Sequence, residues 1–378
     1  MPNVPQGRDG NPLVLNMGAV PFSLWPTDLQ RRARPTQAEI LTLNPWYLIQ
    51  HRIETDRNRS DYNKRYALSL LKQALDFFEA AQNPRIDTKA LLLYYSFLNL
   101  SKAFILFKDP SADLNKIMHG ISEEVAVNGT EFFDAQLKLY PHRNKTSVYD
   151  KLRQALGLSA LTSTQIISVT KDLCPQLVIG HRMWSSISRQ PERFVRVTYA
   201  KYFDNSHNKQ LWLSIGIRKS DLYKTKTNHR DFLKYTGISG NFREVKVIQD
   251  HETSDKIVFE QITPRIYQST RNRELEYLSN LIKGNLYTVV RRDIPYRRHY
   301  LQINRNNHIF ENKILIPYLL IYYLGSVTRY RPHYMEIIKR SDYGPLIEES
   351  IRVQGKQFLY LLASEFLQRE ISESAVIS

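Results

Sequence analysis

Residues 90–108 read ALLLYYSFLNLSKAFILFK, the most apolar run in the chain. Apolar residues occur on nearly every side of this segment, which predicts a buried helix at the centre of its domain. A second apolar run, ILIPYLLIYYLG, occupies residues 314–325. It is shorter than the ~20 residues that cross a bilayer, and Asn99 and Lys102 interrupt the first run. We therefore expect two core helices that pack together in one bundle, and no transmembrane segment.

Helical signals precede the first run and end it. Asn44-Pro45-Trp46 predicts a helix start, because proline in the first turn lacks only an N–H that has no partner there. Leucines and phenylalanine recur at helical spacing over residues 66–81. The central helix then begins with Asp87 or Thr88 as its N-cap. It ends at Asp109-Pro110, because proline disfavours a helical conformation in the residue before it.

The pattern changes near residue 192 from helical spacing to short alternating runs. These runs are rich in β-branched and aromatic residues and are separated by Asn, Asp, Gly and Ser, so they predict an antiparallel sheet of four or more strands. A helix over 273–283 is expected to end at Gly284. The expected strands are 194–199, 211–215, 245–248, 257–259, 286–291 and 299–303, and short helices are expected at 147–157 and 163–173.

Together these signals predict an α+β protein with a discontinuous helical core. The core is formed by residues 40–191 and 306–378, and an antiparallel β-rich segment, 192–305, is inserted between its two parts. Residues 1–39 lack periodicity and contain proline and glycine, which predicts an extended N-terminal arm anchored by residues such as Trp25. The insertion explains why the two apolar helices are far apart in the sequence.

The composition indicates a basic globular protein of 378 residues. Lys and Arg total 53 against 37 Asp and Glu, a net charge of +16. This excess favours polyanionic partners such as nucleic acid, an acidic protein or an anionic membrane surface. The cations are spread along the chain, so an ordinary basic protein remains an equal alternative. The single cysteine, Cys174, excludes an internal disulfide and a Cys/His zinc motif, which fits a cytoplasmic location and a structural role.

Four sequence islands resemble the YaaC-like family of bacterial proteins. They are Asn44-Pro45-Trp46, the segment 91–103 leading to Asp109-Pro110, His119-Gly120 and Arg329-Tyr330-Arg331-Pro332. The resemblance implies a bacterial cytosolic protein without an established enzymatic activity. It also implies a helical core reminiscent of HEPN-type bundles.

YaaC-like domains also occur in anti-phage defence, notably in the two-gene Juk system against jumbo phages. The resemblance thus implies a JukA-type sensor or adaptor that works with a protein partner encoded nearby, without a cofactor. A structural member of a multiprotein assembly is a further class that the sequence leaves open.

The central helix carries the first candidate binding residues. Tyr95, Asn99 and Lys102 are spaced i, i+4 and i+7, which places them on one face. A cation held among these polar groups could bind a phosphate or a carboxylate. The alternative is a lysine whose amine is paired with a carboxylate such as Asp109.

Arg329 and Arg331 follow the second apolar run and are further anion-binding candidates. The guanidinium group suits bidentate binding of phosphate or carboxylate, although both arginines could instead bridge to acidic residues of neighbouring helices. His119 is a candidate general base, because its ordinary pKa lies near neutral pH. Its alternative role is to fix a turn. Convergence of Lys102, His119 and Arg329 would favour a binding site.

A HEPN-like ribonuclease or nucleic-acid-binding protein is the alternative function. Such a ribonuclease needs an arginine and a histidine close together on a helix, and Arg292 and His299 have a similar spacing. Pro295 between them argues against a helix. The surrounding basic stretch, 291–305, also contains Tyr296 and Tyr300, so it could follow a phosphate backbone or form a solvated hairpin rim.

Common catalytic motifs are absent from the sequence. It has no Walker A motif, GxGxxG loop, HExxH pair, nucleophile elbow or EF-hand loop. We therefore expect no metal site, no cofactor and no common enzymatic scheme. Peripheral contact with a membrane remains open through the charge alone.

Overall fold

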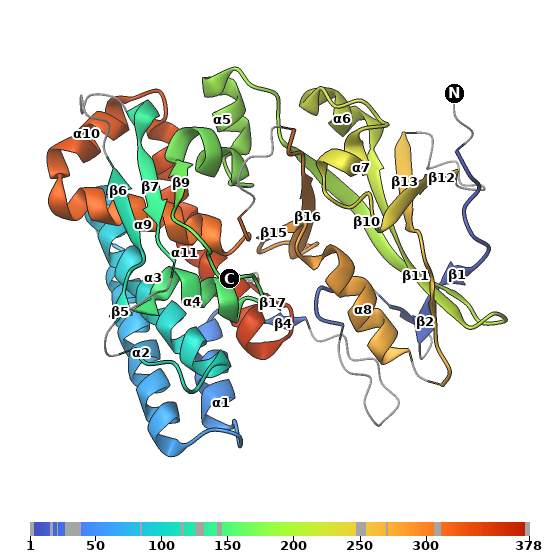
Figure 1. Ribbon diagram of the computed structural model, residues 1–378, viewed down its shortest axis with the longest axis horizontal. Coiled ribbons are helices and arrows are strands. Elements are labelled where there is room, and N and C mark those ends of the chain that lie inside the picture. The colour runs from blue at the N-terminus through green and yellow to red at the C-terminus, as the bar shows by residue number, and fades with distance from the viewer. Residues whose placement is uncertain are drawn as a thin grey trace. The chain divides into compact units, whose positions relative to one another are not determined.

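The protein folds into two units, shown in the computed structural model of Figure 1. One, the helical unit, contains Leu43–Gln190 and Ile309–Leu367; the other, the sheet unit, contains Met1–Thr42, Pro191–His308 and Gln368–Ser378. The combination of helices and antiparallel sheet makes the fold α+β. The residues that the structure describes are 4–15, 18–20, 22–26, 39–83, 85–114, 117–124, 132–141, 146–246, 255–269, 271–305 and 311–374.

The division into units differs from the expected one at both chain ends. The boundaries after residues 190 and 308 lie near the expected limits of the β-rich segment. Residues 1–42 group with the sheet rather than standing apart as an arm, and residues 368–378 also group with the sheet rather than with the helices. Both ends of the chain are thus parts of the sheet unit.

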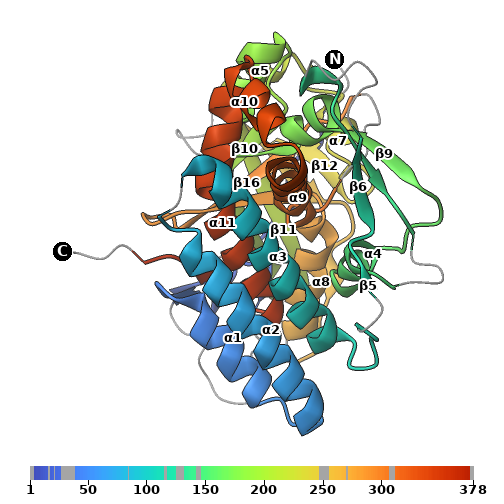
Figure 2. The same ribbon diagram turned by 90° about the vertical axis from the view of Figure 1, so that its left-hand side faces the viewer.

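The helical unit is built around α3, Ile86–Lys108, which contacts α2, α4, α9 and α11. Phe97 of α3 stacks on Phe358 of α11 with ring centroids 3.9 Å apart, and α9 approaches α3 closely at Gly325. The two apolar runs therefore pack together, as predicted (Figure 2). The other helices of this unit are α1 (Pro45–Glu54), α2 (Asp61–Ala80), α4 (Val148–Ala155), α5 (His181–Ser188), α9 (Leu315–Tyr330), α10 (Pro332–Arg340) and α11 (Gly344–Leu367).

By length and composition alone, the segment Thr88–Lys108 could cross a membrane. However, 78% of its most apolar window is buried inside the structure. Core helices of globular proteins have the same composition, because neighbouring helices cover them on all sides. The burial therefore favours a core helix.

The predicted start of α1 is confirmed, whereas the predicted cap of α3 is wrong. Asn44 Oδ1 accepts a hydrogen bond from the Trp46 N–H over 3.1 Å, and Pro45 occupies the first turn. Helix α3 begins one residue before the expected caps, after Arg85, and has no side-chain cap. Its C-terminal end at Lys108 is as predicted.

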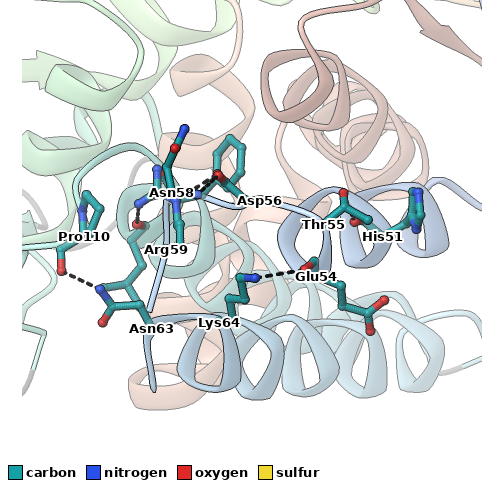
Figure 3. Close-up of polar contacts among 11 residues, drawn as sticks. His51, Glu54, Thr55, Asp56, Asn58, Arg59, Asn63, Lys64 and Pro110 are labelled. Carbon is teal, nitrogen blue, oxygen red and sulfur yellow. Dashed lines mark hydrogen bonds and ion pairs between the residues drawn. The ribbon is translucent and has the colours of Figure 1, made fainter. Parts of the chain in front are cut away.

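The C-terminal end of α3 is held by Arg59 from the turn between α1 and α2 (Figure 3). The guanidinium donates to the Leu106 carbonyl over 2.9 Å and also to the Phe107 carbonyl. Its Nε donates to Asp56 over 3.1 Å. Burial raises the pKa of Asp56, but the Asn58 N–H and the Arg59 charge outweigh burial and lower it overall. The turn between α1 and α2 thus caps the C-terminal end of α3.

Short strands also occur in the helical unit, and one of them corrects a prediction. The expected helix at 163–173 is wrong: Gln165–Ser168 is strand β9, followed by a turn of π-helix, Val169–Leu173. Strand β9 pairs with β7, Gln136–Leu139, and that pairing overrides local helical spacing. The expected helix at 147–157 is confirmed as α4. The remaining strands of this unit are β5 (Ile117–Met118), β6 (Ile121–Glu124) and β8 (Thr146–Ser147).

The sheet unit contains the predicted antiparallel sheet. Its strand order is β12-β13-β11-β10-β16-β15, with β1 added at β10 and β14 at β11. The expected strand at 245–248 begins earlier, and residues 247–248 lie outside the described residues. The strands are β1 (Asn11–Pro12), β10 (Phe194–Asn205), β11 (Gln210–Arg218), β12 (Phe242–Val245), β13 (Lys256–Gln261), β14 (Arg265–Ile266), β15 (Leu286–Val290) and β16 (Arg297–Gln302).

One face of this sheet is covered by three helices. Side chains of α6, α7 and α8 join the core that the sheet builds with Val195, Ile217 and Leu301. The predicted helix before Gly284 is confirmed as α8. The helices are α6 (Lys219–Thr225), α7 (Phe232–Tyr235) and α8 (Asn272–Lys283).

Described segments near both chain ends are held within the sheet unit. The predicted anchor Trp25 is 6% exposed. Near the C-terminus, β17 (Ile371–Ser372) pairs in parallel with β4 (Ile40–Leu41), and buried Arg297 donates to the Ile371 carbonyl over 2.6 Å. The unit also has a two-stranded ladder of β2 (Val14–Leu15) and β3 (Gly18–Ala19).

Candidate anion-binding site

The central helix presents two tyrosines to neighbouring elements of the helical unit. Tyr95 stacks on Phe77 of α2, with ring centroids 5.2 Å apart. Tyr94, the residue before it, packs edge-on against Tyr322 of α9. A Cβ at Gly325 would lie 2.8 Å from the Tyr94 Cβ, so only glycine lets α9 come this close. Aromatic packing therefore fixes the position of both hydroxyl groups.

Arg329, at the C-terminal end of α9, reaches the first of these hydroxyls. Its Nη1 donates to Tyr95 Oη over 2.7 Å. The same guanidinium lies 4.9 Å from the centroid of the Tyr330 ring, and the Tyr330 side chain is 63% exposed. One predicted arginine and one predicted tyrosine are thus joined directly, although they come from distant parts of the sequence.

His119 is bound to the second hydroxyl. Its Nδ1 lies 2.5 Å from Tyr94 Oη. In the tautomer with the proton on Nε2, Tyr94 donates to Nδ1, and Nε2–H is left to donate to a ligand. Burial, followed by the nearby tyrosines, raises the pKa of Tyr94 above its usual range, so this hydroxyl keeps its proton.

The turn that carries His119 is fixed by its backbone. Gly120 adopts φ +75°, and a Cβ there would lie 1.8 Å from Ser147 Oγ, so this position requires glycine. Tyr149 N–H donates to the His119 carbonyl over 3.2 Å. The backbone and Gly120 therefore fix this turn, and the ring of His119 is bound to Tyr94 rather than to a carbonyl of the turn.

The third candidate, Lys102, acts electrostatically on His119. Burial lowers the pKa of His119, and the positive charges of Lys102 and Arg329 lower it further. Lys102 and Arg329 therefore both act on His119. We call Lys102, His119 and Arg329, with the two tyrosine hydroxyls, the cation cluster.

No carboxylate neutralises the cluster in the part of the chain that the structure describes. Burial alone lowers the pKa of Lys102. The alternative partner, Asp109, accepts from Ser111 and pairs with Lys151 at 3.7 Å, so that pairing is wrong for Lys102. Like charges held together in a partly buried place repel, and a bound anion would relieve the repulsion.

The cluster is accessible from solvent. His119 and Arg329 are exposed, and Lys102 is half-buried. Small anions such as phosphate or carboxylate are the ligands that guanidinium and ammonium groups recognise. The arrangement can therefore bind an anion through three donors, with Tyr95 orienting the guanidinium.

Two further predicted residues lie apart from these contacts. Asn99 is 7% exposed, but no hydrogen bond among the described residues links it to the cluster. Arg331 begins α10, and its charge acts on the buried Tyr323 and Tyr334, lowering pKa values that burial raises overall. Arg329 and Arg331 thus have different surroundings.

The arginine and histidine of the ribonuclease alternative lie in the sheet unit. Arg292 precedes β16 and pairs with Glu373 at 2.9 Å. His299 lies within β16, with Nδ1 3.0 Å from Thr288 Oγ1 and its ring edge-on to Phe22. They occupy a β-hairpin rather than a helix, as Pro295 indicated, so the pair lacks the helical context that such a ribonuclease needs.

Most arginines of the basic stretch 291–305 already have protein partners. Arg291 pairs with Asp293, Arg297 is buried, and Arg305 donates to Thr227 Oγ1 over 2.8 Å. This stretch is therefore not a continuous row of free cations. Arg298 differs from these, because its buried Nε has no hydrogen-bond partner among the described residues.

Sequence reasoning missed Tyr94 and Tyr322. Tyr94 lies one residue before the predicted face of α3 and looked like an ordinary core aromatic. Among the described residues, no three His, Cys, Asp or Glu side chains are grouped as a metal site would require.

Comparison with known proteins places the chain in a family. A family model described as YaaC-like Protein matches residues 31–366. No curated protein and no solved structure matches the chain. The family match covers most of the chain and includes both apolar helices and every residue of the cation cluster. The chain belongs to the YaaC-like protein family.

Proposed function

We propose that this protein is a non-enzymatic sensor or adaptor in bacterial anti-phage defence, and that the cation cluster binds the anionic group that it recognises. A protein partner receives the signal. YaaC-like domains resemble the JukA-type component of a defence system, and this chain belongs to their family. The proposal adds that recognition takes place at the cation cluster of this chain.

The observation that carries the proposal is the meeting of Lys102, His119 and Arg329 without a described carboxylate. A half-buried lysine is normally paired, because an unpaired buried charge is costly. Here the charges of Lys102 and Arg329 add to burial in lowering the pKa of His119. Such an arrangement is typical of a site that an external anion completes.

The charge of the whole chain supports the same proposal. A net charge of +16 attracts anionic ligands and speeds their encounter with the protein. A HEPN-like form of the helical core and a cytoplasmic location belong to this proposal as well, through the family resemblance.

The test is protection against phage in the native host. A strain lacking the gene would be complemented with the parent protein, Lys102→Met or Arg329→Ala. Matched controls are Lys72→Met and Arg340→Ala, which remove exposed charges from α2 and α10 of the same unit. We expect the two cluster variants to lose protection at equal protein levels and the controls to retain it.

Two outcomes would reject the proposal. One is unchanged phage sensitivity after deletion of the gene, which would remove the defence role. The other is full protection by both cluster variants, which would leave the cluster without a part in the response.

A ribonuclease is the second candidate, and His119 favours it. In the tautomer whose Nδ1–H donates to Tyr94, Nε2 is free to accept a proton. The lowered pKa keeps this imidazole neutral at neutral pH, beside two cations that suit a phosphate. Labelled RNA would be incubated with the parent protein, His119→Ala and His299→Ala. Cleavage that requires His119 would replace the adaptor proposal, and no cleavage by any form would reject the enzyme.

A further inference from the structure

The sheet unit has a second sheet surface, opposite the helix-covered core. Successive residues of a strand point to opposite faces. Because Val195, Val197 and Leu301 belong to the core, their neighbours Arg196 and Tyr300 point to the other face. We call this surface the outer face; the strands that form it are labelled in Figure 1.

Strand register gathers cations on the outer face. Arg196 of β10 lies directly opposite Tyr300 of β16, and Arg298 shares that face two residues before Tyr300. Beyond a bulge in β10, Lys201 lies opposite Ser214. At the end of β11, Arg218 completes the set. These cations come from three neighbouring strands rather than from one basic stretch, so the sequence did not reveal them as a group.

The cations lack acidic partners in the described part of the chain. None of Arg196, Lys201, Arg218 or Arg298 forms an ion pair there, and Arg298 Nε is a buried donor without a hydrogen bond. A buried carboxylate of this face, Glu260, is already held by the Arg8 backbone N–H and side chain. The outer face therefore carries positive charge that the described residues do not neutralise.

Register also places like charges against each other. Arg218 lies directly opposite Lys256 on the neighbouring strand. Direct cross-strand pairs of like charge destabilise a sheet. A polyanion bound across the strands would be attracted to both side chains, whereas an uncharged or basic partner would not.

Aromatic rings lie among these cations. Tyr300 packs against Phe194 with ring centroids 6.4 Å apart. Tyr199 lies over Gly216, where a Cβ would be 2.1 Å from the ring, and Lys201 Nζ is 5.9 Å from the same ring. Tyr199 and Tyr300 are half-buried, so one side of each ring is supported by the sheet. Such supported rings suit stacking with planar bases.

We propose that the outer face binds single-stranded nucleic acid. Arg196, Arg298, Lys201 and Arg218 hold the phosphates, and Tyr199 and Tyr300 stack on unpaired bases. A duplex keeps its bases stacked on each other, so it would reach only the cations and would bind more weakly. This surface is distinct from the cation cluster of the helical unit, so either proposal can fail without the other.

Fluorescence anisotropy with the whole protein tests this proposal. The probe is labelled oligothymidylate or oligouridylate of about 20 nucleotides, longer than the ~4–16 that one small fold covers. The test variants are Arg196→Ala/Arg298→Ala, Tyr300→Ala and Tyr300→Phe. The charge-matched control, Lys224→Ala/Arg230→Ala, removes two exposed cations near the helix-covered side.

We expect the double arginine variant to weaken binding about ten-fold or more. It should also reduce the slope of log affinity against log salt by about 1.4, from ~0.7 per phosphate contact. Tyr300→Ala should weaken binding about five-fold or more, while Tyr300→Phe retains the stacking ring and the affinity. The control should change affinity less than two-fold.

Three results would overturn the proposal. They are no binding of either single strand, equal affinity for single strand and duplex, and equal loss in the control and test arginine variants. Far-UV circular dichroism on each variant verifies folding. Arg218→Ala, at an exposed strand end, provides a second test if the double variant does not fold.

Discussion

The partly buried charge of Lys102 destabilises the folded protein until an anion binds. Its side chain is half-buried, and burial lowers the pKa of its amine. A lysine kept for stability would instead have an acidic partner or extend into water. Function at the expense of stability is the usual sign of a binding residue.

Replacing this lysine by methionine should stabilise the ligand-free protein. Lys102→Met keeps the apolar stem and removes the charge, so we expect a gain of roughly 1 kcal/mol. For a unit of this size the gain corresponds to a rise in Tm of about 2–4 °C. Differential scanning calorimetry would measure it, and a loss of stability would show that the amine holds the fold together.

His119 should make the ligand-free protein less stable in acid. Its folded pKa lies below the unfolded value, so as pH falls through about 6.5 the unfolded chain takes up a proton that the folded protein does not. The contribution of His119 is therefore fully present above that pH and is lost below it. Urea unfolding between pH 7.5 and 5 should show a steeper loss for the parent than for His119→Gln. Parallel curves would contradict this account.

The residues of the cluster were predictable individually, but their geometry was not. Lys102 and Arg329 stood out because charges are rare within or beside apolar helices. Arg329 bonds to Tyr95, whereas Arg331 lies near Tyr323 and Tyr334. This difference depends on the orientation of α9 about its own axis relative to α3. Rotation is set by close packing at Gly325, which no local pattern in the sequence specifies.

At the scale of elements, the C-terminal end of α3 depends on one arginine. The last carbonyls of a helix lack partners within the helix, and Arg59 supplies two donors to them. The same side chain lies over the Phe107 ring and pairs with Asp56. A single residue therefore connects the turn after α1 with the centre of the helical unit.

Removing this cap should destabilise the helical unit. Arg59→Ala leaves two carbonyls and the Asp56 carboxylate without their donor, and we expect a loss of about 2 kcal/mol. Urea unfolding followed by circular dichroism would measure it. Arg57→Ala, an exposed arginine in the same turn, should change the stability by less than about 0.5 kcal/mol. Similar losses in both variants would show that the cap contributes nothing specific.

The sequence predicted long elements better than short ones. The helix of residues 86–108 and the strands from 194 onward carry many periodic residues, so their patterns are strong. The segment 165–168 has only four residues, and its pairing with 136–139 decides its conformation. The helical N-cap at Asp87 or Thr88 was wrong because Arg85 already begins the helix without a side-chain cap.

At the scale of the whole molecule, the chain ends complete the sheet unit. The Ile40 N–H donates to the Glu370 carbonyl over 2.8 Å, and Glu370 Oε1 accepts from the Leu24 N–H. Burial raises the pKa of Glu370, although Arg297 and the Leu24 N–H oppose that rise. Residues near the two termini thus share one buried network with the sheet.

Deleting residues 368–378 should therefore loosen the sheet unit and leave the helical unit intact. The deletion removes the partner of β4 and the acceptor of Arg297. Hydrogen exchange should become faster in β4 and β16 while amides of α3 and α9 keep their protection. Equal loss in both units would show that the C-terminal segment supports the helices as well.

The central claim is that the cation cluster is completed by an anion, and the ionisation of His119 reports this most directly. Histidine-ring NMR would follow its titration with and without inorganic pyrophosphate, in the parent protein and in Lys102→Met. We predict a pKa for His119 below 6.5 in the free parent protein that rises by about one unit or more with the anion, and a smaller rise in Lys102→Met. An identical His119 titration with and without pyrophosphate, or an equal rise in both proteins, would contradict the account.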